Sequence, residues 1–145
     1  MRFLNVAIVL ALLALPTPVA LAQHDAERSI SCGCSGGFTG GGSGVTVLWD
    51  GAILRWSRPT YRDSLEESLI RSDPRAARQF FAQLDEMNFT SIHYKKTGNM
   101  TCHLTLRQGS TTHAVAWEPG DSSAPPLVVA LASRLQRLAL PVESN

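Results

Sequence analysis

The sequence has 145 residues, 44% of them hydrophobic, with 13 basic and 12 acidic residues and a formal net charge of +1. This length is typical of one domain. A near-neutral chain without a clustered basic patch does not have the composition of a protein that binds nucleic acid or a membrane surface. We therefore expect neither kind of partner.

The N-terminal residues have the pattern of a secretory signal peptide. Arg2 gives a positive start, the run Phe3–Leu15 is nearly all apolar, and Ala20-Leu21-Ala22 is an A-x-A cleavage site. We expect residues 1–22 to be removed on export to the periplasm or the extracellular space.

The mature chain, 23–145, is expected to form a single domain with an ordered core at about 29–140, and it contains three cysteines, Cys32, Cys34 and Cys102. An oxidising compartment favours one disulfide, and the odd count leaves one thiol. Cys102 is expected to pair with Cys32 or Cys34, and the spacing does not distinguish between these two partners.

The stretch SCGCSGGFTGGGSG, Ser31–Gly44, is rich in glycine and follows the start of a short expected strand at 29–35. A phosphate-binding loop of the Walker type requires Lys and Ser or Thr after its last glycine and then a helix, whereas the strand-like Val45-Thr46-Val47 follows here. A zinc site is disfavoured because Cys32-Gly-Cys34 is shorter than the usual C-x₂₋₄-C pair and four ligands are needed. We interpret the stretch as a turn and bulge region, in which glycine supplies positive φ and close backbone approach.

The segment Val45–Trp56 predicts a β-hairpin around Asp50-Gly51, a two-residue signal for a type I′ turn. With that turn Trp49 pairs with Ala52 and Val45 pairs with Trp56, so that these side chains lie on one face of the hairpin.

After the hairpin we expect a polar connection over 57–72, with a helical turn near its centre, and then a helix over 73–88. Asp73 is a favourable N-cap, and Pro74 fits the first helical position. The apolar residues at helical spacing are Ala77, Phe80, Phe81, Leu84 and Met87.

Three further strands are expected at 92–96, 100–107 and 110–117. Short loops make each of these strands the neighbour of the next, with Cys102 paired to Val115. The side chains expected on their shared buried face are Ile92, Tyr94, Met100, Cys102, Leu104, Leu106, Val115 and Trp117.

The last helix is expected to begin near Pro125-Pro126, with Ser122 or Ser123 as its cap, and to end at Pro141. Its expected apolar stripe comprises Leu127, Leu131, Leu135 and Leu138. Hairpins before and after a helix predict an α+β fold, with an antiparallel sheet of about four to five strands and helices packed on one face.

The histidines do not assemble a catalytic or metal site in this arrangement. His93 and His103 are expected opposite each other on the outer face of the sheet, where no carboxylate completes a ligand set. His113 is expected on the core face, half-buried, with one hydrogen-bond partner. Strand alternation puts Cys102 on the face away from the first two histidines, and no G-x-S-x-G motif occurs. We therefore expect a binding protein rather than an enzyme, with no catalytic residue, no metal and no cofactor.

Three segments carry a resemblance to a known family. SGGFTG at Ser35–Gly40, HAVAW at His113–Trp117 and APPLVVALASRL at Ala124–Leu135 occur in this order. They resemble emfourin, the family of small bacterial protein inhibitors of thermolysin-like (M4) metallopeptidases. The signal peptide, the three cysteines and the longer glycine run at Gly40–Gly44 depart from the simplest members of that family.

The resemblance implies a protein partner, a secreted metallopeptidase, that is blocked by surface complementarity. It implies that the partner is contacted by the segment comprising Gly36, Gly37, Phe38, Thr39 and Gly40. Phe38 either anchors the partner or packs into the core of its own domain, and its exposure distinguishes these possibilities. The alternative function is that of a periplasmic or secreted binding or structural accessory protein with a different partner.

Overall fold

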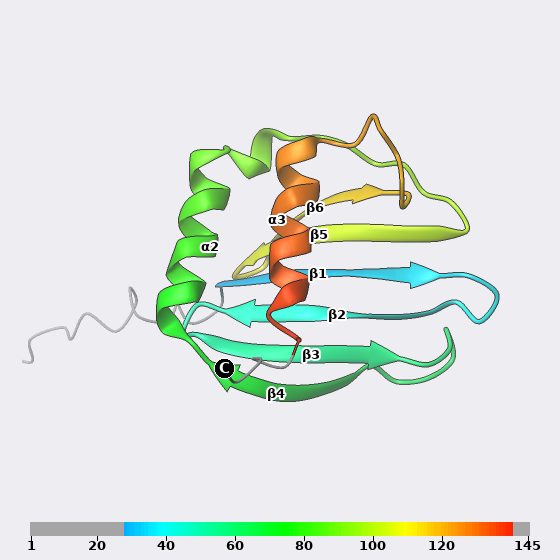
Figure 1. The fold of residues 1–145 in the computed structure, drawn as a ribbon, viewed down its shortest axis with the longest axis horizontal. Coiled ribbons are helices and arrows are strands. Elements are labelled where there is room, and N and C mark those ends of the chain that lie inside the picture. The colour runs from blue at the N-terminus through cyan, green and yellow to red at the C-terminus, as the bar shows by residue number, and fades with distance from the viewer. Residues whose placement is uncertain (1–27, 141–145) are drawn as a thin grey trace, which may run out of the picture.

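The computed structural model describes residues 28–140; the signal peptide expected at 1–22 and the helix stop expected at Pro141 lie outside the described residues. Six strands form one antiparallel sheet in the order β4-β3-β2-β1-β5-β6 (Figure 1). The strands are β1 Arg28–Gly36, β2 Gly41–Leu48, β3 Ala52–Arg58, β4 Glu66–Ser72, β5 Met100–Gln108 and β6 Thr111–Trp117. The helices are α2 Pro74–Glu86, the short 3₁₀ helix Phe89–Ser91, and α3 Pro126–Arg137.

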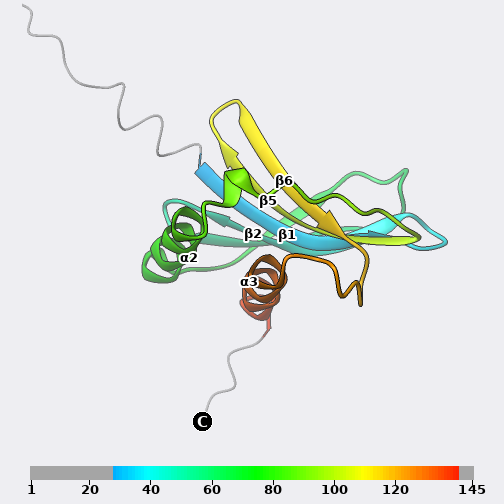
Figure 2. The ribbon, with the colours of Figure 1, turned by 90° about the horizontal axis from the view of Figure 1, so that it is seen from above.

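The molecule has two layers, with α2 and α3 on the same side of the sheet (Figure 2). The core lies between the sheet and the helices. It consists of alternate side chains of the strands and of the side chains on one face of each helix. Its largest fully buried members include Phe81, Phe89, Ile30, Ile53, Leu84, Leu104 and Leu135. The predicted α+β class with an antiparallel sheet is confirmed, but the sheet has six strands instead of four to five.

The β2–β3 hairpin differs from the prediction by one residue. Val47 pairs with Ile53 and Gly44 pairs with Trp56, so that the connection has an extra residue. The Asp50 carboxylate accepts a hydrogen bond from the Ala52 N–H (3.0 Å), which stabilises this longer turn. Since a one-residue shift moves side chains to the other face, Trp56 lies on the face away from the helices.

Trp56 is nevertheless buried, because its indole ring lies over glycines of β2 and β1, the next two strands of the sheet. A Cβ atom added to Gly44 would lie 2.6 Å from the ring, and one added to Gly33 would lie 2.3 Å from it. The ring reaches as far as β5, where it stacks on His103 at a centroid distance of 5.8 Å. Gly33 and Gly44 therefore belong to strands β1 and β2, and the turn between these strands is much shorter than the glycine-rich stretch that was expected to form it.

The expected polar connection at 57–72 is wrong in its second half, which forms the edge strand β4. Leu69 pairs with Leu54 and Arg71 pairs with Ile53, so that Ile70 is an extra residue at a bulge. The bulge interrupts the alternation, and most residues of β4 are exposed. Neither side of this strand therefore has the apolar pattern by which a strand is recognised in a sequence.

The arrangement beyond α2 also differs from the prediction. β5 pairs with β6 two residues away from the predicted register, with Cys102 opposite Trp117. A two-residue shift preserves the faces, so Cys102, Leu104 and Trp117 are buried as expected. The expected burial of Met100 is wrong, because this residue begins β5 at the end of the sheet and is exposed. The expected strand at 92–96 is not a neighbour of β5; it touches the outer edge of β6 through one parallel bridge between Lys95 and Ala116.

The helix expected at 73–88 is confirmed, since the Asp73 carboxylate accepts the Ala76 N–H (2.9 Å) and Pro74 is the first helical residue. In α3 the predicted stripe is partly wrong, because Leu127 is exposed and Val128 is buried instead. Neither predicted serine caps this helix, whose N-cap position is held by Pro125 without a side-chain hydrogen bond.

The C-terminal end of α3 is held by the sheet. The guanidinium of Arg71 donates to the Leu138 carbonyl (2.9 Å), and that of Arg55 donates to the Ala139 carbonyl. Positive side chains at this end also complement the helix dipole.

Candidate functional site

The segment singled out by the sequence forms the turn between β1 and β2, at the end of the sheet on the right of Figure 1. Gly36 and Gly41 are the last paired residues, and the Gly40 N–H donates to the Gly37 carbonyl (3.2 Å). Gly37 and Gly40 have φ of +70° and +65°, values that residues with a side chain rarely adopt. The two glycines thus close a tight turn with Phe38 and Thr39 at its corners.

Phe38 is fully exposed, as is expected of a partner contact and not of a core residue. Exposed single apolar residues are common on protein surfaces, but a phenyl ring at the apex of a projecting turn has no apolar neighbour to shield it. Phe38 therefore does not contribute to its own domain's core, and the structure removes the second of the two sequence-based interpretations.

Tyr61 and Met100 flank this turn and were not recognised from the sequence as site residues. Both are exposed, Tyr61 by 62% and Met100 by 40%. A Cβ atom at Gly40 would lie 3.0 Å from Cβ of Tyr61, and one at Gly37 would lie 3.8 Å from Cε of Met100. We call the three exposed side chains Phe38, Tyr61 and Met100 the apolar tip.

If β4 had been predicted as a strand, the position of Tyr61 would have followed from it. With β3 and β4 joined as neighbours, the connection between them must lie at the same end of the sheet as the β1–β2 turn. Arg62 adds a charge beside the tip, since its guanidinium donates to the Tyr61 hydroxyl (2.8 Å) and lies over the ring at 5.2 Å.

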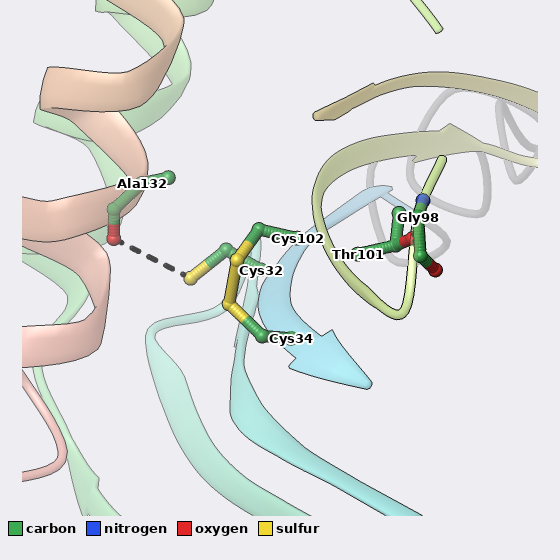
Figure 3. Close-up of a disulfide and its surroundings, with 6 residues drawn as sticks. All are labelled: Cys32, Cys34, Gly98, Thr101, Cys102 and Ala132. Carbon is green, nitrogen blue, oxygen red and sulfur yellow. Dashed lines mark hydrogen bonds between the residues drawn. A yellow bond between two sulfur atoms is a disulfide. The ribbon is translucent and has the colours of Figure 1, made fainter. Parts of the chain in front are cut away.

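The disulfide joins Cys34 to Cys102, and Cys32 is the free cysteine (Figure 3). Cys34 and Cys102 are directly opposite each other on β1 and β5. Two residues further along the same strands, Gly36 is opposite Met100. The disulfide therefore ties together β1, which leads into the Phe38 turn, and β5, which begins at Met100.

Cys32 lies on the helix side of β1 and is fully buried. Its thiol donates a long hydrogen bond to the Ala132 carbonyl of α3, with an S···O distance of 3.6 Å (Figure 3). Burial raises the pKa of this thiol to about 12, so that it stays protonated at neutral pH. Cys32 is a core residue and not a nucleophile or a metal ligand in this state.

The expected pairing of His93 with His103 is wrong, because β1 occupies the side of β5 expected for the 92–96 segment, which lies beyond β6 instead. His93 lies beside His113, with ring centroids 5.4 Å apart. His103 stacks on Trp56, and burial lowers its pKa. The expected half-buried His113 with one partner is confirmed by a 2.9 Å hydrogen bond between its Nε2 and the Ile92 carbonyl.

Within residues 28–140 no three His, Cys, Asp or Glu side chains lie close enough together to hold a metal ion. In the same part of the chain, neither helix has the length and apolar character needed to cross a membrane.

A small ion cluster holds the connection after β6, near the end of the sheet that carries the Phe38 turn. Tyr94 donates a 2.5 Å hydrogen bond to the Asp121 carboxylate, and Lys96 lies 3.3 Å from it. These contacts, together with the Ser123 N–H, hold the pKa of Asp121 below its usual range. The same hydrogen bond raises the pKa of Tyr94.

Compared with known proteins, the chain matches no family model and none of the curated proteins.

Proposed function

We propose that this protein is an exported inhibitor of a secreted metallopeptidase, of the emfourin type, which acts by surface complementarity. The observation that carries the proposal is the fully exposed Phe38 at the apex of a turn closed by glycines. Aromatic side chains are frequent anchors of protein interfaces, because they bury a large apolar area and have few rotatable bonds.

Two further features support the proposal. Residues 1–22 have the pattern of a signal peptide, and the disulfide between Cys34 and Cys102 is typical of proteins of oxidising compartments. The SGGFTG motif that resembles emfourin coincides with the projecting turn, so the residues carrying the resemblance are also those best placed to contact a partner.

The proposal predicts that the mature chain, 23–145, inhibits a thermolysin-like peptidase in a peptide-hydrolysis assay. Phe38→Ala should weaken inhibition by about 30-fold or more, the effect of losing an interface anchor. The thermal midpoint should not change, because the ring contributes nothing to the core. The matched control is Leu127→Ala, which shortens an exposed apolar side chain on α3.

Absence of inhibition at micromolar excess across a panel of secreted peptidases would contradict the proposal. Capture of a partner that is not a peptidase, in an interaction abolished by Phe38→Ala, would support the alternative of an accessory binding protein. Equal effects of Phe38→Ala and Leu127→Ala would show that the apolar tip is not the contact surface.

A further inference from the structure

The Phe38 turn differs in shape from a peptidase substrate. Extended peptides bind by pairing their backbone with the edge of a strand in the partner. Here the chain reverses direction between Gly37 and Gly40, and the 3.2 Å hydrogen bond between these residues closes the turn. The peptide bonds on either side of Phe38 are therefore not presented in an extended conformation.

Several contacts hold the turn in this closed shape. The Gly37 N–H donates to the Asn99 carbonyl (2.6 Å), and the Tyr61 N–H donates to the Thr39 carbonyl (3.1 Å). The Gly41 N–H donates to the Thr39 hydroxyl (3.3 Å). The turn is thus tied to the chain on both sides of it, which lowers the entropy lost when a partner binds.

The shape of the tip indicates the shape of its partner. A fully exposed phenyl ring at an apex buries its whole surface only if it enters a hole, whereas a flat partner would contact one side of the ring. Tyr61 and Met100 lie beside Gly40 and Gly37, the two glycines that flank the apex, so they are placed to contact the rim of such a pocket.

We propose that Phe38 inserts its phenyl ring into a closed apolar pocket of the peptidase while the backbone of the turn stays uncut. This rests on the proposed function, and it adds a mechanism in which the inhibitor blocks the cleft as a plug and not as a slow substrate. The glycines at 37 and 40 keep the turn closed, and the disulfide between Cys34 and Cys102 anchors β1, which leads into the turn, to β5.

The test uses side chains of different size at Phe38, which is too exposed for these changes to affect folding. Phe38→Leu should weaken inhibition by less than tenfold, and Phe38→Trp, whose second ring exceeds a phenyl-sized pocket, by tenfold or more. Equal or tighter inhibition by Phe38→Trp would overturn the closed pocket. Absence of inhibition by the wild type itself would instead overturn the proposed function.

A second measurement examines cleavage. The wild type is incubated for a day with an equimolar amount of the peptidase, and the mass of the inhibitor and the residual activity are followed together. The inhibitor should stay intact and the activity suppressed. Recovery of activity with cleavage beside Phe38 would show a slow substrate and overturn the plug mechanism, although inhibition itself would stand. Gly37→Ala strains the turn at a position with φ of +70° and should be cut faster than the wild type.

Discussion

Gly33 and Gly44 are needed in this fold for the space that they leave, because the indole of Trp56 crosses both of them. The ring thereby covers the centre of the sheet on the face opposite the helices, and His103 extends the cover onto β5. The apolar area buried by one indole is comparable to that of a large core residue. This second, smaller cluster explains why glycine occurs in the middle of two paired strands, where it is otherwise unfavourable.

Gly44→Ala should therefore destabilise the protein by about 3 kcal/mol, the effect of inserting a methyl group into a fully packed site. The added Cβ would lie 2.6 Å from the Trp56 ring and 2.0 Å from the Cys32 carbonyl oxygen, so the strand itself must move. Urea unfolding followed by tryptophan fluorescence measures the change. Ser43→Ala, at the exposed neighbouring position of β2, is the control and should stay within about 0.5 kcal/mol. Equal stabilities of the two variants would contradict this packing.

The segment after β6 depends on one carboxylate. Asp121 accepts hydrogen bonds from the Tyr94 hydroxyl and the Ser123 N–H and pairs with Lys96, while its side chain is only 3% exposed. These contacts join the connection that leads into α3 to the segment that borders β6. The ion cluster thus fixes the position where α3 begins, since that helix has no side-chain cap of its own.

The stability contributed by Asp121 should depend on pH. Its pKa is lower in the folded than in the unfolded state, so the contribution is complete above the ordinary aspartate pKa of about 3.9 and is lost as the pH falls through the lowered folded value. Asp121→Asn should lower the urea midpoint at pH 7, and its difference from the wild type should shrink toward pH 2.5. Asp63→Asn, on the exposed β3–β4 connection, is the control. A difference that stays constant with pH would contradict the assignment.

Elements with local signals were predictable from the sequence. Helix α2 is an example, because Asp73 and Pro74 mark its start and one apolar face continues through it. Strand β4 lacks such a signal, being an exposed edge with a bulge at Ile70. The β2–β3 register depended on one extra turn residue, and this single shift placed Trp56 on the opposite face.

The candidate site was predictable in part. The motif identified the β1–β2 turn, but the exposure of Phe38 depends on a turn length that no local pattern specifies. Tyr61 comes from a distant loop that only the order of the strands brings near. Strand alternation places Cys32 and Cys34 on the same face of β1, so that the long-range register with β5 alone selects Cys34 as the partner of Cys102.

At the scale of the whole molecule, the disulfide stabilises the folded state, whereas the free thiol can react only when the fold opens. The link between Cys34 and Cys102 closes a loop with a sequence separation of 68, for which chain entropy gives a stabilisation of about 4 kcal/mol. The Cys32 thiol lies in the centre of the core between β1 and α3. It becomes accessible only when these two elements separate.

Cys32 should therefore report global unfolding. Three cysteines minus the two in the disulfide leave one thiol per chain. Because the thiol is fully buried, and burial raises its pKa to about 12, its reaction with Ellman's reagent at pH 8 should be slower than that of an ordinary cysteine by roughly a thousandfold or more. In denaturant without reductant it should react fully, with one equivalent per chain, and Cys32→Ala should give none.

Because reaction requires α3 to leave β1, the reaction rate of Cys32 in low denaturant should follow the free energy of unfolding. Rapid reaction of the native protein would show that α3 opens locally or that Cys32 is not in the core.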